Sequence, residues 1–183
     1  MKILLVHTPF DWKRPITTIS HLIRKVARTF YNHASFLVEI KGVLYILESD
    51  INGVVKVKYV DWVKEQIISV YEIPDELQFK SGNRAKAMIG HFSYSFFDLL
   101  WFMPIYIFTN KWYGRTIEEA SNKPTCYEYI ARVMEFKNWH RMTPNELKQE
   151  MESRGYIQTH YNIKAKHYEN IGKNRVVASE FKE

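Results

Sequence analysis

The stretch YNHASFLVEIKGVLYILESDINGVVKVKYVDWV covers Tyr31–Val63 and is rich in Val, Ile, Leu, Tyr and Phe. β-branched and aromatic residues favour strands, and breaks at Lys41–Gly42 and at Asp50–Gly53 divide the stretch into three parts. Breaks this short join strands that lie side by side and run antiparallel. The sequence therefore predicts a meander of three consecutive antiparallel strands, the last of which covers Gly53–Val63.

Weaker patterns predict the elements around this meander. An apolar run predicts a first strand near Lys2–His7, and EQIISVYEIP predicts a fourth strand that Pro74 closes. The segment TTISHLIRKVAR, Thr17–Arg28, carries its apolar residues on one helical stripe, which is typical of an amphipathic surface helix. A further helical passage ends at Gly90, and an aromatic-rich segment follows over His91–Tyr113.

Length and composition predict a single α+β domain over residues 1–183. The chain of 183 residues is 46% hydrophobic, which suffices for one core, and it contains no internal repeat, low-complexity tract or linker. The tail over residues 157–183 has mixed polarity, and we expect it to add one strand.

The absence of targeting and membrane-spanning patterns and the distribution of charge limit the functional classes that the sequence favours. The N-terminus lacks the apolar core of a signal peptide, and the longest apolar stretch, Phe96–Phe108, is shorter than the roughly 20 residues of a membrane span. We therefore expect a cytoplasmic or particle-associated protein without a transmembrane segment. The formal net charge is +6, but the basic residues are scattered, which favours a solvated surface over specific nucleic-acid binding.

The chain's one cysteine lies where a helix begins. In PTCYE, Thr125 and Glu128 stand three apart just before an apolar run, which is the pattern of a capping box. Thr125 is then the N-cap and Cys126 the first helical residue. Unpaired N–H groups and the helix dipole stabilise a thiolate at that position. This placement favours a nucleophile, although a lone cysteine at a helix start is more often inert. TPNEL, at Thr143–Leu147, predicts a second capped helix, which Gly155 ends.

The hairpin at Lys41–Gly42 supplies a candidate base. A loop of two or four residues pairs positions whose numbers sum to 83, so Ser35 lies opposite Glu48 and His33 lies opposite Asp50. His33 and Glu48 then share one face of the sheet as diagonal neighbours, where a carboxylate orients an imidazole. Asp50 and Glu128 are the alternative carboxylates, and a one-residue slip of the hairpin would place Glu48 on the wrong face.

The order His, Glu, Cys resembles that of the circularly permuted NlpC-type papain-like cysteine hydrolases, to which the lecithin:retinol acyltransferase group is related. The likeness spans about residues 16–156. The segments that carry it are SHLIRKVARTFYNHA before the histidine strand, YNHASFLVE as the histidine strand, YILES as the polar-residue strand, GVVKVKYVDWV as the next strand, CYEYIARVM as the nucleophile helix and TPNEL as the following helix start.

The resemblance implies a papain-like fold in permuted order, with an antiparallel barrel packed against helices. It implies Cys126 as the nucleophile, His33 as the base and Glu48 as the orienting residue, and it requires no metal or organic cofactor. Tyr94 resembles a tyrosine that approaches the reaction centre, although core packing explains it equally well. Tyr127 departs from the family pattern, in which a small residue commonly follows the cysteine.

The function expected is a thiol-dependent hydrolase or acyltransferase that cleaves an amide, ester or thioester through an acyl-enzyme. Peptide, peptidoglycan and acyl-lipid substrates fit the sequence equally. One alternative is a catalytically silent papain-like module that binds within a larger assembly. The other is a basic surface protein that contacts nucleic acid or membrane, for which binding would depend steeply on salt.

Overall fold

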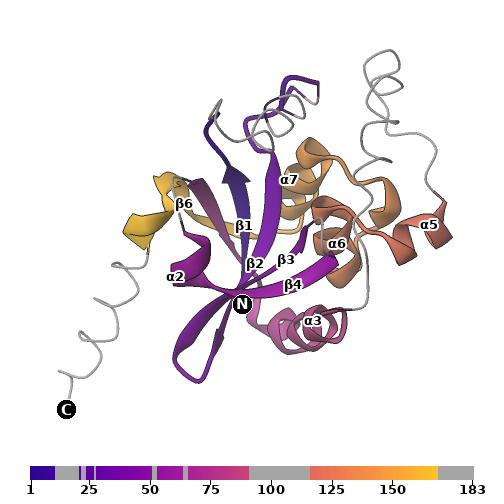
Figure 1. Ribbon diagram of the computed structural model, residues 1–183. Coiled ribbons are helices and arrows are strands. Elements are labelled where there is room, and N and C mark those ends of the chain that lie inside the picture. Colours follow the sequence, from indigo (N-terminus) through magenta and orange to yellow (C-terminus); the bar gives the residue numbers. More distant parts are fainter. Residues whose placement is uncertain are drawn as a thin grey trace.

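A computed structural model of the protein describes residues 1–10, 21, 24–26, 28–50, 53–63, 66–90 and 116–168. Its centre is an antiparallel sheet of six strands in the order β4-β3-β2-β1-β5-β6 (Figure 1). The strands are β1 (Lys2–His7), β2 (His33–Ile40), β3 (Val43–Asp50), β4 (Gly53–Lys58), β5 (Ile67–Glu72) and β6 (Ile157–Lys164). The α+β class and the expected antiparallel sheet are confirmed.

Helices cover this sheet, and one of them lies against the strands of the predicted meander. The helical elements are α2 (Tyr59–Trp62), α3 (Asp75–Ala87), α5 (Ile117–Asn122), α6 (Cys126–Val133), α7 (Pro144–Ser153) and the 3₁₀ turn η1 (Trp139–Arg141). Helix α6 packs against β2 and β3, and α3 and α7 pack beside it (Figure 1).

The register of the β2–β3 hairpin is the predicted one. Pairs run from Phe36 opposite Leu47 to Ile40 opposite Val43, so paired numbers sum to 83. Lys41 and Gly42 both have positive φ, of 52° and 75°, as the tight turn between twisted strands requires. The turn therefore fixes which residues of β2 and β3 share a face.

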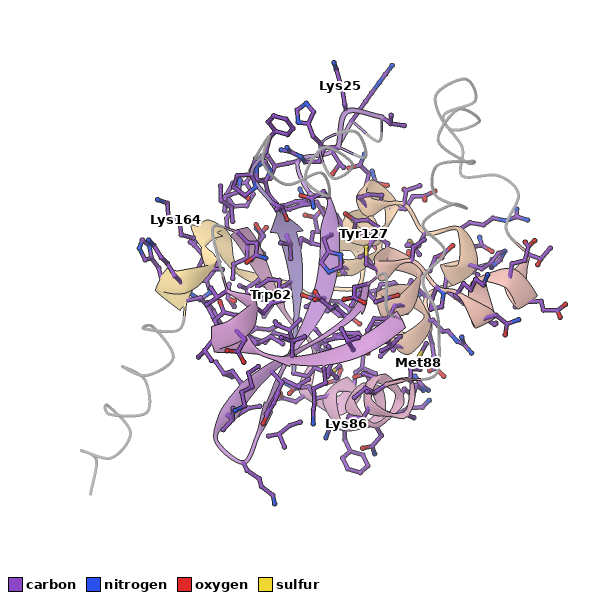
Figure 2. All side chains as sticks on the ribbon, in the orientation of Figure 1. Lys25, Trp62, Lys86, Met88, Tyr127 and Lys164 are labelled. Carbon is purple, nitrogen blue, oxygen red and sulfur yellow. The ribbon has the colours of Figure 1, made fainter. Side chains whose placement is uncertain are left out.

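Two apolar cores lie on opposite faces of the sheet. The first contains the inward residues of α6 together with Phe36 and Leu47. The second contains Leu37, Tyr59 and Trp62. Figure 2 shows Trp62 and Tyr127 on opposite sides of the sheet, in agreement with their different cores. The central strands β1, β2 and β5 are thus buried on both faces.

One expected strand was too long, and one helix was not predicted. The strand predicted over Gly53–Val63 ends at Lys58, and α2 follows because Tyr59 and Trp62, three residues apart, both bury their rings in the second core. Helix α5 was not predicted, although Thr116 and Glu119 form a complete capping box at its start. That spacing is visible in the sequence and is the signal that was missed.

Other expected elements are confirmed or lie outside the described residues. The strands over Lys2–His7 and Ile67–Glu72, the helix before Gly90 and the late strand β6 are present. In the expected helix over Thr17–Arg28, residues 21 and 24–26 are helical, and most of the other positions lie outside the described residues, as do residues 91–115 and 169–183. Among the described helices, none combines the length and apolar character that crossing a membrane requires.

Both predicted capping boxes are present. At the start of α6 the Thr125 N–H donates to Glu128 Oε2 at 2.7 Å, and the Glu128 N–H donates to Thr125 Oγ1 at 3.3 Å. The same exchange between Thr143 and Glu146 begins α7. Cys126 is therefore the first residue of its helix, as expected.

A hydrogen bond to β3 positions the start of α6. The buried Ser49 hydroxyl donates to the Pro124 carbonyl oxygen at 2.7 Å, across 75 residues of sequence. Because Pro124 lies two residues before Cys126, this contact ties the beginning of the cysteine helix to the strand that carries Glu48.

We predict that Thr125→Ala lowers the free energy of unfolding by about 1 kcal/mol, because the Glu128 N–H then loses its acceptor at a buried helix start. Urea denaturation of the two proteins measures the difference. Thr125→Ser keeps the acceptor and is the matched control. Equal losses in both variants would assign the effect to the methyl group rather than to the cap.

Candidate active site

A histidine and a glutamate meet at one end of the β2–β3 hairpin. His33 Nε2 lies 2.7 Å from Glu48 Oε2, and both side chains are largely shielded from solvent. His33 begins β2 and Glu48 lies near the end of β3, so the hairpin brings them together from 15 positions apart in sequence. The diagonal contact expected from the register is the one observed.

The third predicted residue, Cys126, begins the helix that packs against β2 and β3, the two strands that carry His33 and Glu48. Cys126 lies near enough to His33 to raise the pKa of the imidazole, and the hydrogen bond of the imidazole goes to Glu48. Since Nε2 faces the Glu48 carboxylate, it carries a proton, and Nδ1 is the nitrogen left for the thiol. The hydrogen bond to Glu48 thus determines which imidazole nitrogen faces away from the carboxylate.

Trp62 is a partner of Glu48 that the sequence analysis missed. Its indole Nε1–H donates to Glu48 Oε2 at 2.9 Å, so this one oxygen accepts from both Trp62 and His33. The two donors hold the carboxylate in one orientation. The position was missed because residues 59–62 were expected to continue a strand, whereas the helical turn of α2 directs Trp62 into the second core.

The electrostatics favour a charged imidazole. Burial alone lowers the pKa of His33, because it disfavours the protonated ring. The electrostatic influence of Cys126 and of Glu48, together with the hydrogen bond to Glu48, outweighs burial and raises the pKa of His33 well above its usual range. The imidazolium of His33 and the carboxylate of Glu48 therefore stabilise each other.

Glu48 responds in the opposite direction. Burial tends to raise the pKa of its carboxyl, but the charge of His33 and the hydrogen bonds from His33 and Trp62 hold the pKa of Glu48 below its usual range. Glu48 is therefore an anion at neutral pH. It orients and stabilises the imidazolium, and it has no proton to transfer.

Access to the three residues is uneven. The Cys126 residue is only 4% exposed, whereas the His33 side chain keeps 21% of its surface in contact with solvent. The imidazole is therefore the more accessible of the two side chains. Tyr127, which stands where a small residue was expected, is itself buried in the first core and does not extend into solvent.

The remaining candidates take other places. Asp50 ends β3 and pairs with Gly53, and Glu48 is the carboxylate that hydrogen-bonds His33. Glu128 is buried at the N-terminus of α6, where it closes the capping box. Tyr94 lies outside the described residues. Within the described ranges, no three or more His, Cys, Asp or Glu side chains gather closely enough to hold a metal ion.

Comparisons with protein families and with curated proteins found no match for this chain. We therefore infer the function from the arrangement of His33, Glu48 and Cys126 and from the chemistry of those groups.

We predict that Glu48→Gln lowers the pKa of His33, because the neutral amide no longer stabilises the imidazolium. The histidine ring signals followed by NMR as a function of pH measure this shift. Asp50→Asn removes a carboxylate two residues away on the same strand, and we expect it to leave the titration of His33 close to that of the wild type. An unchanged titration in Glu48→Gln would contradict the assigned ion pair.

Proposed function

We propose that the protein is a papain-like cysteine hydrolase or acyltransferase that cleaves an amide, ester or thioester. The observation that carries the proposal is that His33 hydrogen-bonds Glu48 while Cys126 begins the helix that packs against the same two strands. A nucleophile, a base and a group that orients the base are the three parts that covalent acyl transfer requires.

In the first half of the reaction, His33 takes the thiol proton of Cys126 and the thiolate attacks the substrate carbonyl. The carbon–sulfur bond forms as the carbonyl π electrons move to oxygen. Cys126 is the first residue of α6, so its backbone N–H has no partner within the helix and is one donor for the oxyanion. His33 then protonates the leaving group as the tetrahedral intermediate collapses to an acyl-enzyme.

In the second half, His33 removes a proton from water or from another acceptor, which attacks the acyl-enzyme carbonyl. The carbon–sulfur bond breaks, the acyl product leaves and the thiolate–imidazolium pair is restored. Water as the acceptor gives hydrolysis, and an alcohol or amine gives acyl transfer. No step needs a metal or an organic cofactor.

The order of elements supports the papain-like and permuted parts of the proposal. The histidine strand β2 and the glutamate strand β3 precede the cysteine helix α6, which is the order of the permuted NlpC-type branch. The antiparallel sheet with α6 packed on β2 and β3 is compatible with that architecture. Peptide, peptidoglycan and acyl-lipid substrates all contain the bond that such a site cleaves.

We predict that iodoacetamide alkylates Cys126 at neutral pH, below the range in which an ordinary thiol with a pKa of about 8.5 reacts. Cys126 is the only cysteine, so alkylation measured by mass spectrometry reports on this one site. His33→Ala should slow alkylation markedly, and turnover of an ester or thioester by that variant should fall by about 10²- to 10⁴-fold.

Two controls sharpen this test. Glu48→Gln should reduce turnover less than His33→Ala, because the base remains while its orienting anion is lost. Cys126→Ser should form no thioester adduct. If Cys126 in the wild-type protein reacts no faster than an ordinary thiol and no acyl adduct is trapped, the catalytically silent binding module becomes the better account.

A further inference from the structure

A second group of polar side chains lies beside the candidate active site. The Arg24 guanidinium contacts two histidines, with Nη1 3.0 Å from His7 Nδ1 and 3.1 Å from His7 Nε2, and with Nη2 3.2 Å from His21 Nδ1. His7 ends β1, whereas Arg24 and His21 come from the helical residues that precede β2. Neither histidine has a part in the proposed reaction.

The hydrogen bonds show that His7 is neutral. His7 Nδ1 lies 2.9 Å from the Phe30 carbonyl oxygen, which can only accept, so Nδ1 carries the proton. Nε2 then carries no proton, and its lone pair accepts a hydrogen bond from Arg24. Burial and the charge of Arg24 lower the pKa of His7, which keeps the ring in this form. The histidines therefore accept hydrogen bonds from Arg24 without neutralising its charge.

Arg24 has no anionic partner within the described part of the chain. Its contacts there are the two imidazoles, and its buried Nε–H makes no hydrogen bond at all. A partly buried guanidinium keeps its charge, and leaving that charge without a counter-ion costs free energy. Guanidinium groups in this situation bind carboxylates and phosphates, whose oxygens match the N–H fork.

The sheet places this cation close to the reaction centre. Val6 pairs with His33 on the neighbouring strand, and His7 is the next residue along β1. With strands about 4.8 Å apart and a rise of about 3.3 Å per residue, the backbones of His7 and His33 are roughly 6 Å apart. Side chains alternate along a strand, so His7 leaves the sheet on the face opposite to that of Val6, and this opposite face is the one on which α6 and Cys126 pack. A substrate attacked by Cys126 can therefore extend along this face past His7 to Arg24.

Exposed aromatic rings border the same cation. Phe30 stacks on His7 with ring centroids 4.2 Å apart and is 43% exposed. Phe10 lies 5.4 Å from the His21 ring and is 53% exposed. Rings this exposed offer apolar surface next to a charged group. Lys25, by contrast, extends into solvent at the same end of the molecule, as Figure 2 shows, and it is the ordinary surface cation of this helix.

We propose that Arg24, supported by His7 and His21, is a subsite that binds a carboxylate or phosphate of the substrate, with Phe10 and Phe30 covering the carbon atoms beside that anion. The assignment to a substrate rests on the proposed function, and it narrows the substrate class to acidic acyl compounds. The anion supplies a counter-charge that no described residue gives Arg24, and it fixes the distance between the acidic group and the scissile carbonyl.

Binding can be tested without turnover, by NMR of the histidine rings during titration with phenylacetate, phenyl phosphate and neutral phenylacetamide. We expect saturable shifts of the His7 and His21 signals with one or both anions and not with the amide. The anion that binds with the lower dissociation constant shows whether the subsite prefers a carboxylate or a phosphate. Arg24→Gln should abolish the shifts, and Lys25→Gln should preserve them.

Turnover tests the assignment to the substrate. Acyl thioesters that end in a carboxylate are compared with thioesters of equal length that end in a carboxamide. We expect the wild type to favour the acids in kcat/KM and Arg24→Gln to lose this preference by about ten- to a hundredfold, the range expected for a charged hydrogen bond. Lys25→Gln should behave as the wild type.

The outcomes separate this inference from the proposed function. Equal shifts with phenylacetate, phenyl phosphate and phenylacetamide, together with equal turnover of acids and amides, would overturn the subsite and leave the thiol mechanism intact. Saturable anion binding in a protein whose Cys126 forms no acyl adduct would support the anion site and overturn both its assignment to a substrate and the proposed reaction.

Discussion

The two-residue turn at Lys41–Gly42 is the constraint on which the candidate site depends. Because both residues adopt positive φ, β2 and β3 pair in a single register, and Glu48 becomes the diagonal neighbour of His33. A slip of one residue would turn Glu48 to the opposite face, away from Trp62, and leave the imidazole without its anion. The turn thus determines the chemistry at the far end of the hairpin.

The helix start is the second part of this arrangement. Thr125 and Glu128 close the first turn of α6, and the Ser49 hydroxyl holds the Pro124 carbonyl against β3. Cys126 is thereby held near enough to His33 to raise the pKa of the imidazole. A buried hydrogen bond thereby joins the strand that carries Glu48 to the start of the helix that carries Cys126. This coupling explains how residues far apart in sequence form one site, and why its charges can support one another.

The hairpin register and the start of the cysteine helix could be predicted because each depends on residues that are close together in sequence. The hairpin register followed from one short turn, and the capping box followed from residues three apart. Trp62 was missed because its role depends on packing between α2 and the second core, which no local pattern records. The contact between Arg24 and His7 was missed for the same reason, since it joins a helix and a strand that only the tertiary fold brings together.

The proposed function requires that Cys126 form a thiolate–imidazolium pair with His33, which Glu48 orients. The ultraviolet absorbance of a thiolate measures this pair directly, because Cys126 is the only thiol in the chain. The account predicts thiolate absorbance at neutral pH in the wild type, its complete loss in Cys126→Ala and a strong decrease in His33→Ala. Absence of the band at neutral pH in the folded wild-type protein, or its persistence in His33→Ala, would contradict the account.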